Sequence, residues 1–399
     1  MRTDDFTIVQ ALDSYLRITE NWIHRQLKHL PATKTIIVTD RVLGSGFDLP
    51  AATTIRSPLQ PRLWEGQRIT RWLRLRRLLC RITYIRYASW RLRHTQVDLV
   101  HSHFAQVGWR FHKLAKRLGV AHMISFYGWD YVRLANSGSR WKQRLATLFA
   151  EADAFVCEGP HGRQLLIQQG CPPEKVYVSR LGVETDRIAF IERRKPRGTL
   201  RLLQIASFRE KKGQIDAVAA FATALGNCTD MHLTLIGDAP GRVHDVVAAL
   251  IAEHGISDKV SLLPGVPFDE LHEAMRDHHV FIHPSRHAAD GDCEGGAPVV
   301  LLDAQATGMP IIATTHCDIP EEVLDGVTGL LCPERDVAAL TRCIHRFHEM
   351  DTTEYNAYAS AARLHVEQHF EARMCAADLE QIYAKVIAAR NTGEASCIR

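Results

Sequence analysis

Short apolar runs rich in β-branched residues alternate with amphipathic stretches along most of the chain. Ten of these runs are expected to form strands: Thr35–Thr39, Asp98–His101, His122–Phe126, Ala154–Cys157, Lys175–Ser179, Leu202–Ala206, His232–Ile236, Val260–Leu263, Val280–His283 and Ile311–Thr314. Helical periodicity fills the intervals, for example in Gln214–Leu225. Apolar strands separated by helices are typical of parallel sheets that helices cover on both faces. The pattern therefore predicts an α/β protein.

The length of 399 residues exceeds the roughly 250–300 residues that a single core usually serves. The basic stretch Ile191–Gly198 suits neither a helix nor a strand, and we place a linker at 191–198. The predicted division is two Rossmann-like domains at 1–190 and 199–375, followed by a helix and tail at 376–399. A net charge of +4 with 46% hydrophobic residues indicates a globular protein and excludes wholesale disorder.

The ten cysteines include no CxxC pair and show no zinc-binding spacing, so free thiols and a cytoplasmic location are expected. The N-terminus has no signal-peptide pattern, and the longest apolar run, about nine residues, is too short to cross a bilayer.

One segment, Arg62–Arg93, is strongly basic, with ten arginines against one acidic residue, Glu65. Apolar residues recur in it at helical spacing and tryptophans are interleaved. One interpretation is an interfacial helix that meets anionic lipid on the inner face of a membrane. The other is a helix packed on the sheet with a solvated arginine face. No nucleic-acid-binding motif accompanies the charge, so nucleic acid is not an expected partner.

Three strand ends carry residues suited to anion binding. In the stretch His283–Thr307, Pro298 is expected to be the first helical residue, and the backbone amides of Gly295, Gly296 and Ala297 would point outward to hold a diphosphate. Basic residues, Arg209, Lys211 and Lys212, follow the strand Leu202–Ala206, and Gly237 ends a third strand. Ligands bind outside the carboxyl ends of parallel strands. An ordinary glycine-rich turn and a solvated basic loop are the alternatives.

These motifs resemble the retaining glycosyltransferases of family 4, which have the GT-B architecture of two Rossmann-like domains facing each other across a cleft. The resemblance covers most of the chain and is strongest from Cys157 to Val323. Six pieces match in family order: ADAFVCEGPHGRQLL, KVYVSRLGVE, ASFREKKG, the HPS loop, EGGAPVVLLDAQATGMPIIAT and IPEEVLDGVTGLL. The resemblance also implies that the last helix crosses back to the first domain.

The family pattern assigns roles by position. Glu294 matches the acidic residue near the anomeric carbon of the transferred sugar, and Asp303 matches the residue that binds the ribose hydroxyls. Eight residues separate them where the family has seven, and Asp replaces the usual Glu. Lys212 matches the diphosphate-binding lysine. Ser207 stands where the family has arginine, so Arg209 is expected to supply that charge.

The N-terminal half carries HSHFAQVGW and SFYGWDY, which resemble the acceptor domain of polysaccharide-type members. Tyr127 stands where many relatives have histidine. His103, Tyr127 and Asp130 are expected to line the acceptor side of the cleft, with Glu158 after the strand Ala154–Cys157. The stretch Leu16–Leu30 looks like the first helix of this group.

The resemblance implies transfer of a sugar from a nucleotide diphosphate donor to a glycan or lipid-linked glycan, with retention of configuration. No catalytic metal or other cofactor is expected, because Lys212, Arg209 and the loop amides would hold the leaving diphosphate. Asp290-Gly291-Asp292 has metal-motif spacing but lies in a segment that resembles metal-free relatives. The alternatives are a GT-B phosphorylase, a sugar-nucleotide epimerase, and a two-lobed binding protein without catalysis.

Overall fold

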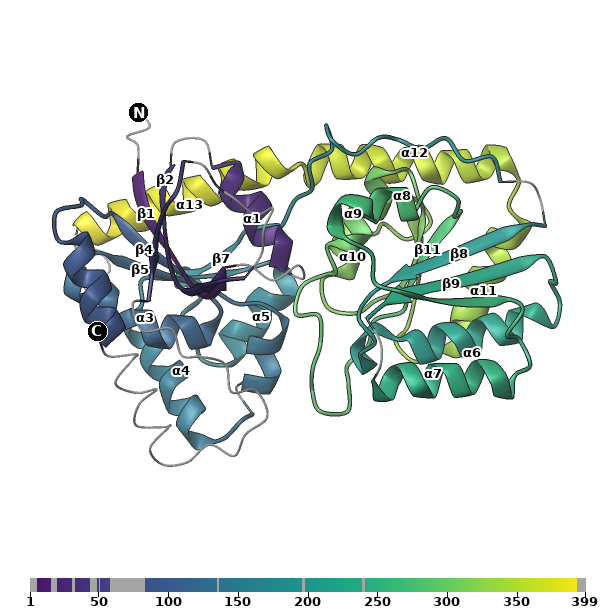
Figure 1. Ribbon diagram of the computed structural model, residues 1–399, viewed down its shortest axis with the longest axis horizontal. Helices are drawn as coiled ribbons and strands as arrows, with labels where there is room; N and C mark the ends of the chain where they lie inside the picture. Colours follow the sequence, from purple (N-terminus) through teal and green to yellow (C-terminus); the bar gives the residue numbers. More distant parts are fainter. Residues whose placement is uncertain are drawn as a thin grey trace.

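The protein folds around two parallel β-sheets that lie side by side along its long axis (Figure 1). The computed structural model describes residues 6–15, 20–30, 33–43, 49, 51–57, 83–134, 136–195, 198–238 and 241–392. The first sheet has the order β3-β2-β1-β4-β5-β6-β7 and the second has the order β10-β9-β8-β11-β12-β13. The strands are β1 (Phe6–Tyr15), β2 (Thr33–Val42), β3 (Thr53–Arg56), β4 (Leu99–His103), β5 (Ala121–Ser125), β6 (Ala154–Cys157), β7 (Val176–Val178), β8 (Leu200–Ile205), β9 (Met231–Gly237), β10 (Val260–Pro264), β11 (Val280–His283), β12 (Ile311–Thr314) and β13 (Gly329–Cys332).

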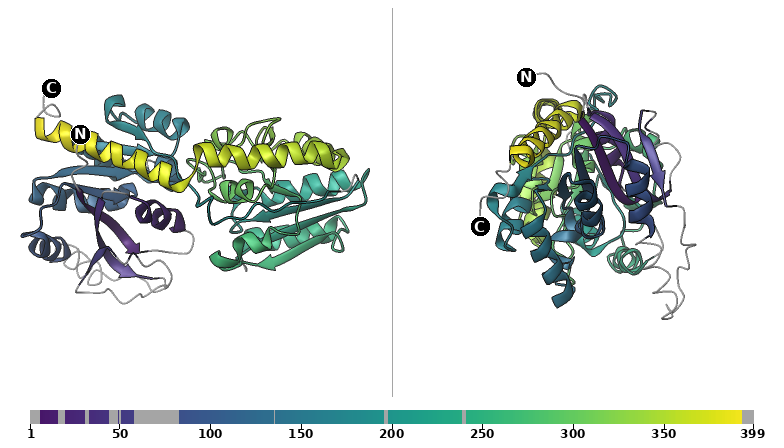
Figure 2. Two further views of the ribbon diagram at one scale, coloured as in Figure 1. Left: turned by 90° about the horizontal axis from the view of Figure 1, so that it is seen from above. Right: turned by 90° about the vertical axis from the view of Figure 1, so that its left-hand side faces the viewer.

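Helices cover both faces of each sheet (Figures 1 and 2). They are α1 (Asn21–Lys28), α3 (Ala105–Leu118), α4 (Ser139–Glu151), α5 (Pro160–Gln168), α6 (Gln214–Leu225), α7 (Arg242–Glu253), α8 (Leu271–Ala274), α9 (Val300–Ala306), α10 (Ile319–Glu322), α11 (Val337–Glu349), α12 (Thr352–His369) and α13 (Ala372–Thr392). Residues 83–92 are also helical. The two sheets with their helices are the GT-B architecture that the sequence predicted.

All ten expected strands are present, with ends within three residues of those predicted. The prediction missed β1, β3 and β13. Of these, β1 is a central strand whose alternation is broken by polar residues such as Gln10. Gln10 is fully buried because its amide is bonded to Tyr383 Oη at 3.0 Å and to His103 Nε2 at 3.0 Å. Those partners lie far away in the sequence, so the local pattern does not reveal a buried strand.

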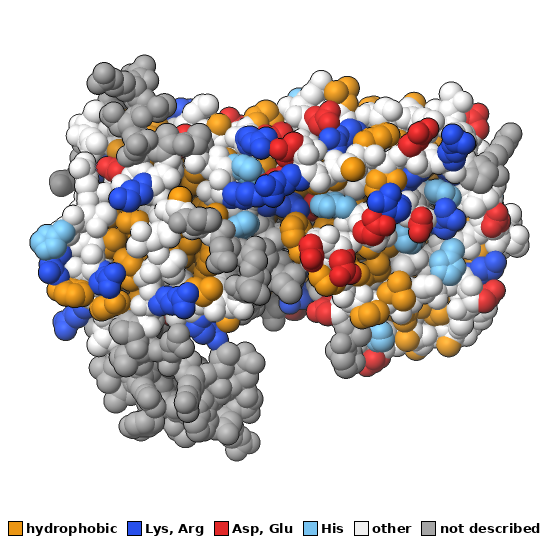
Figure 3. All heavy atoms as spheres, turned by 45° about the horizontal axis from the view of Figure 1, so that its top comes forward, with side chains coloured by type: hydrophobic (Ala, Val, Ile, Leu, Met, Phe, Trp, Pro, Cys, Tyr) orange, Lys and Arg blue, Asp and Glu red, His pale blue; other side chains and the backbone are white. Residues whose placement is uncertain are grey.

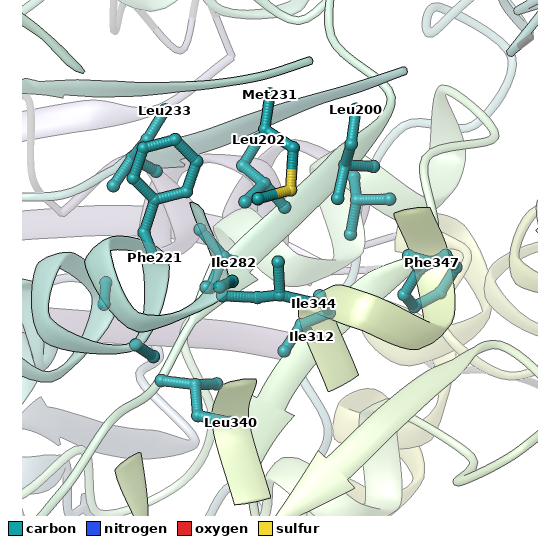
Figure 4. Packing of buried hydrophobic residues seen from close by; sticks show 14 of the residues in the cluster. Leu200, Leu202, Phe221, Met231, Leu233, Ile282, Ile312, Leu340, Ile344 and Phe347 are labelled. Carbon is teal, nitrogen blue, oxygen red and sulfur yellow. The ribbon is translucent and has the colours of Figure 1, made fainter. Parts of the chain in front are cut away.

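Each sheet and the helices that cover it form one half of the molecule, and we call the half with the sheet β1–β7 the first and the half with the sheet β8–β13 the second. The core of each half forms where its strands and helices pack together. In the second sheet, Leu202, Leu233 and Ile282 pack with Phe221 of α6 and Ile344 of α11 (Figure 4). Removing a buried aromatic ring such as Phe221 costs about 3–5 kcal/mol, because the lost transfer free energy adds to the cost of the cavity. Such a core fixes the strand ends from which the functional loops emerge.

The C-terminal helices join the two halves. α12 lies along the second half and α13 lies along the first (Figure 1). Leu379 and Tyr383 of α13 are buried in one cluster with Ile8 and Leu12 of β1. The last described helix thus packs on the sheet that contains the first described strand.

The basic stretch that precedes β8 packs onto the second half. The Lys195 ammonium donates to the carbonyl oxygens of His348 and Met350, at 3.0 and 2.8 Å. The Arg193 guanidinium donates to the carbonyl oxygen of Thr307 at 2.7 Å. Both side chains are buried, so residues 191–195 of the predicted linker are anchored to the second half.

Each sheet has one point at which the strand order reverses. In the second sheet, β8 is followed by β9 on one side, and the chain later returns on the other side with β11. The corresponding point of the first sheet lies between β1 and β4. Loops diverge at such switch points and leave a crevice outside the carboxyl ends of the strands, where ligands bind. The topology therefore directs attention to the loops after β8 and β11 and to the end of β4.

The basic segment Arg62–Arg93 is described only from residue 83 on, and residues 58–82 lie outside the described part. Over residues 83–92, Tyr84, Ile85 and Leu92 are buried, whereas Trp90 is 56% exposed. The Arg93 guanidinium lies 4.6 Å from the centre of the Trp90 ring. This end of the segment packs on the sheet and presents arginine and tryptophan outward. In the described part of the chain, no helix is both long and apolar enough to cross a membrane.

Candidate functional site

The loops after β8 and β11 meet at the switch point and bring Lys212 to Glu294. Lys212 ends a short 3₁₀ helix, Glu210–Lys212, and its ammonium donates to Glu294 Oε2 at 2.8 Å. The other carboxylate oxygen accepts from Ser285 Oγ at 2.9 Å. Two residues that the sequence assigned to one site are thus in direct contact.

The Glu294 carboxylate is buried but remains ionised. Burial alone would raise its pKa, but the ammonium groups of Lys212 and Lys211 outweigh that effect and hold the pKa well below its ordinary value. Conversely, burial lowers the pKa of Lys212, and Glu294 opposes that shift. The result is a charged pair in a largely dry environment.

Lys211 braces the same loop from the other side. Its ammonium donates to the carbonyl oxygen of Cys293 at 2.8 Å and to Asp292 Oδ1 at 3.2 Å. The Asp290-Gly291-Asp292 stretch forms a tight turn in which the Asp292 N–H donates to Asp290 Oδ1 at 3.0 Å. Asp292 thus has an ammonium partner, and the turn fixes the loop that carries Glu294.

The glycine pair of this loop faces the first half of the molecule. A Cβ on Gly295 would lie 2.2 Å from Gly128 Cα, and one on Gly296 would lie 1.8 Å from a Glu158 carboxylate oxygen. Gly295 also has φ +84°, which favours glycine. The glycine pair therefore lies against Gly128 and Glu158 of the first half.

The helix after this loop begins later than predicted. α9 starts at Val300, so Pro298 precedes the helix rather than opening it. The reason is a tight turn in which the Leu301 N–H donates to the Pro298 carbonyl oxygen at 2.8 Å. Ala297 lies in the loop before this turn and lines a narrow interdomain cavity with Glu158.

Asp303 lies at the inner end of this region and is fully engaged. Its carboxylate accepts from Arg25 Nη2 at 2.8 Å, and its Oδ1 lies 3.0 Å from His272 Nε2. Arg25 comes from α1 of the first half and also lies over the Phe268 ring, at 4.7 Å from the ring centre. Burial would raise the pKa of Asp303, but Arg25 and His272 lower it, so the carboxylate is ionised. This ion pair joins the two halves at the position expected for the ribose.

Of the remaining residues predicted to bind the donor, Arg209 is exposed and Gly237 is buried. Arg209 is exposed next to the loop, where it is free to approach an anion. Gly237 is buried at the end of β9, and a Cβ there would lie 2.2 Å from the Ala206 carbonyl oxygen. The close approach of two strand ends is thus enough to explain why a glycine stands at position 237, without a role in donor binding.

On the acceptor side, His103 and Tyr127 form a buried pair. His103 Nδ1 lies 2.9 Å from the Tyr127 hydroxyl, and the two rings are nearly parallel. Burial lowers the pKa of His103 to about 3 and raises the pKa of Tyr127. Both groups are neutral at ordinary pH, which suits hydrogen bonding rather than proton transfer.

Asp130 has a structural position rather than an open one. Its side chain is completely buried, and Oδ2 accepts from the backbone N–H of Ala105, the first residue of α3, at 3.1 Å. Burial raises the pKa of Asp130 to about 7. The predicted position on the cleft wall is not what the structure shows: the carboxyl group caps the start of α3.

Two family models together match nearly the whole chain. The glycosyltransferase family 4 model matches residues 19–187, and the model for glycosyl transferases group 1 matches residues 186–365. The amylovoran biosynthesis glycosyltransferase AmsK of Erwinia amylovora is 30% identical over 293 residues, which cover 72% of this chain and 70% of the relative. The chain belongs to glycosyltransferase family 4.

Other relatives and solved structures agree. The colanic acid biosynthesis protein WcaL of Escherichia coli K12 is 29% identical, over 72% of this chain and 70% of its own length. A glycosyltransferase from Rickettsia africae has the same fold with a TM-score of 0.75 at 15% identity, over 96% of this chain and 99% of its own. Anabaena HepE, solved with UDP and glucose, aligns with a TM-score of 0.72 at 15% identity, over 95% and 100% of the two chains. At such identities the structural likeness concerns the fold alone.

Within this family 4 enzyme, sequence reasoning missed the residues that act across the domain boundary. Arg25 and His272 hold Asp303. Arg25 lies in the stretch Leu16–Leu30, which was assigned no role from the sequence, and His272 lies outside the matching pieces. Two buried carboxyls of the second half, Asp318 and Glu322, line the narrow cavity with Glu158. The matching piece that begins at Ile319 includes Glu322 but not Asp318, and by itself it gives no role.

Proposed function

We propose that this glycosyltransferase transfers a sugar from a nucleotide diphosphate donor to a growing polysaccharide or lipid-linked glycan, with retention of configuration. The observation that carries the proposal is the Lys212–Glu294 pair at the switch point of the second sheet. A cation beside a strand end suits a leaving diphosphate, and an ionised carboxylate suits a sugar centre that becomes cationic in the transition state.

The roles follow from this placement. Lys212 would turn from Glu294 to the diphosphate, and exposed Arg209 would add a second positive charge. Glu294 would then lie beside the anomeric carbon. Because cations would neutralise the leaving group, we propose that the transfer step uses no metal ion. The acceptor would bind on the first half, near the Tyr127 hydroxyl, and attack the face from which the diphosphate departs.

The relatives support a polysaccharide product without fixing the donor. Two of them are named for amylovoran and colanic acid biosynthesis. One relative is named as GDP-mannose-dependent, whereas HepE was solved with UDP-glucose. A thermal-shift screen with UDP, GDP and ADP would identify the base, because a ligand at 100 times its Kd adds about 2.7 kcal/mol to the free energy of unfolding.

The decisive experiment uses the donor found in this way, labelled in the sugar. We expect transfer to a lipid-linked or oligosaccharide acceptor and an α-linked product from an α-linked donor. Glu294→Gln should lose at least about 100-fold in kcat, as for loss of one transition-state contact. Inversion at the anomeric carbon would contradict retention, and full activity of Glu294→Gln would remove this residue from the site.

We also propose that the enzyme works at the cytoplasmic face of a membrane through its first half. On the face drawn in Figure 3, described Asp and Glu side chains gather on the second half, whereas the first half shows mainly Lys and Arg. The exposed Trp90 and the arginines around it belong to this half. Each basic residue near an anionic surface contributes about 1 kcal/mol.

Sedimentation with vesicles that contain phosphatidylserine would test the membrane proposal. Binding at low salt and release at high salt are expected, with weaker binding after Arg74, Arg77 and Arg81 are replaced by Glu. Replacing Arg242, Arg342 and Arg346 of the second half is the matched control. Protein that stays in the supernatant at low salt, or equal binding by both triple variants, would contradict the proposal.

A further inference from the structure

Three side chains of the kinds that bind metal ions, none of them used in the proposed transfer step, lie close together on and next to the loop that carries Glu294. They are His287 and Cys293, which lie on the loop itself, and Cys317, which follows β12. One ligand atom from each residue lies within 4.8 Å of the others. In a tetrahedral zinc site such atoms lie about 3.5–3.8 Å apart, given the usual zinc–sulfur and zinc–nitrogen distances. The three side chains need only a small inward movement to bind one ion.

We propose that Cys293, Cys317 and His287 bind one Zn²⁺ ion that ties the Glu294 loop to the loop after β12. A set of two sulfurs and one imidazole binds zinc in preference to hard cations such as Mg²⁺, which prefer oxygen ligands. The site holds loops together and takes no part in the transfer step. A fourth coordination position remains for a water molecule or a further ligand.

A carboxylate behind His287 orients the imidazole. Glu334 accepts from the backbone N–H of His287 at 2.9 Å, and its Oε1 lies 3.0 Å from Nδ1 of the same residue. This arrangement fixes Nδ1 as the protonated nitrogen and leaves Nε2 to bind the metal. Histidines that ligate zinc regularly have such a carboxylate partner.

The second loop is held by the same carboxylate through His316. Its Nδ1 lies 2.6 Å from Glu334 Oε1, and its Nε2 accepts from the backbone N–H of Glu294 at 3.1 Å. Both nitrogens of His316 are therefore engaged, so this histidine is a support rather than a ligand. It connects the proposed metal site to the residue that the transfer step uses.

The backbone at Cys317 supplies an independent observation. Its φ is +49°, a left-handed conformation that a residue with a Cβ adopts only at a cost. A glycine would adopt it freely, yet the chain places a thiol there.

A disulfide between the two cysteines is the competing interpretation. It would explain the two thiols, but it would not explain the His287 imidazole that Glu334 orients beside them. The presence of two thiols and one imidazole around one point favours the metal.

The test is metal titration of the reduced full-length enzyme. We expect one Zn²⁺ per chain and, with Co²⁺ as the probe, a sulfur-to-cobalt charge-transfer band in the near ultraviolet. Cys293→Ser and Cys317→Ser should each weaken zinc binding by at least about 100-fold, and Glu334→Gln by about 10–100-fold, which is the usual cost of losing an orienting partner. Cys343→Ser, on α11, is the matched control and should bind as the parent does.

Three outcomes would overturn the proposal. The first is a parent enzyme that binds no zinc or gives no charge-transfer band, and this result requires no variant to fold. The second is equal zinc affinity in the parent and in both cysteine variants. The third is a Cys293–Cys317 disulfide, found by mass spectrometry, that forms in air even when Zn²⁺ is present in excess.

Discussion

Lys212 and Glu294 are largely buried and in direct contact, and Lys211 lies farther from the same carboxylate, at 3.9 Å. A change at Lys212 or Glu294 therefore leaves the other residue without its nearest opposite charge. Lys212→Ala should lower kcat by at least about 100-fold, equivalent to about 3 kcal/mol of transition-state stabilisation. The physical reason is that the leaving diphosphate loses its nearest buried cation. Steady-state kinetics with saturating donor and acceptor measure this effect.

Two controls accompany that variant. Lys142→Ala removes an exposed lysine of α4 and should leave kcat unchanged. Lys212→Arg keeps the charge and should retain more activity than Lys212→Ala. Activity of Lys212→Ala within threefold of the parent would show that the ammonium group does not act on the diphosphate.

Asp303 is the second residue at which structure sharpens the sequence prediction. Asp303→Asn should weaken nucleotide binding, as expected for a ribose contact, but it should also destabilise the protein. The Arg25 guanidinium would keep its burial and lose its counter-charge, which typically costs about 3–5 kcal/mol. Calorimetric titration with the nucleotide and chemical denaturation measure the two effects separately.

A double variant separates the two roles. Arg25→Met together with Asp303→Asn removes both charges, so it should recover part of the lost stability without recovering nucleotide affinity. Unchanged nucleotide affinity of Asp303→Asn would show that the ribose is bound elsewhere. Stability of the double variant equal to the sum of the single changes would show that the ion pair is not coupled.

At the level of elements, the apolar sequence pattern predicted those strands whose side chains pack against apolar side chains in the folded protein. β6, β11 and β12 have the predicted ends because both of their faces are buried among aliphatic side chains. β1 was missed because Gln10 and Ser14 are buried in it by tertiary hydrogen bonding and packing. The start of α9 was misplaced because a tight turn after Pro298 precedes the helix.

The same division holds for the site. Lys212 and Glu294 follow strand ends, and the rule that ligands bind at the carboxyl ends of parallel strands suffices to predict that they meet. Arg25 was not predicted, because it lies on a helix of the other half and its contact with Asp303 depends on how the two halves pack together. Asp130 was predicted at the cleft, but motif position does not show that its carboxyl group caps α3.

At the scale of the whole molecule, carboxyl groups from both halves share one buried place. Glu158 of the first half and Asp318 and Glu322 of the second line a cavity of about 10 Å³. Burial, followed by the charges of neighbouring carboxylates, raises the pKa of Glu158 and Glu322, and burial raises that of Asp318 to about 6. In the closed form these carboxyl groups therefore keep their protons to a higher pH than they would when hydrated, in the case of Asp318 to about pH 6.

The sign of the pH effect follows from those raised values. Because the closed form binds more protons than an open or unfolded form, its stability decreases as pH rises from about 4, where free carboxyls ionise, through 6 and above. Lys211 and Arg180 are the nearby cations and oppose the repulsion only in part. His161 and His316 face the same region, but burial lowers the pKa of both, so they do not gain charge in this range.

We therefore expect the enzyme to open as pH rises. Small-angle scattering of the nucleotide-free enzyme should give a larger radius of gyration at pH 8.5 than at pH 6, because ionised Glu158 repels Asp318 and Glu322 across the domain boundary. Glu158→Gln should remain compact at both pH values, whereas Glu253→Gln, at an exposed position on α7, should respond as the parent does. A radius of gyration that does not change with pH, or an undiminished response in Glu158→Gln, would show that these carboxyls do not control closure. Both Lys212 and Glu294 belong to the second half, whereas Arg25 reaches Asp303 from the first half. Opening should therefore break the contact between Arg25 and Asp303 and leave the contact between Lys212 and Glu294 intact.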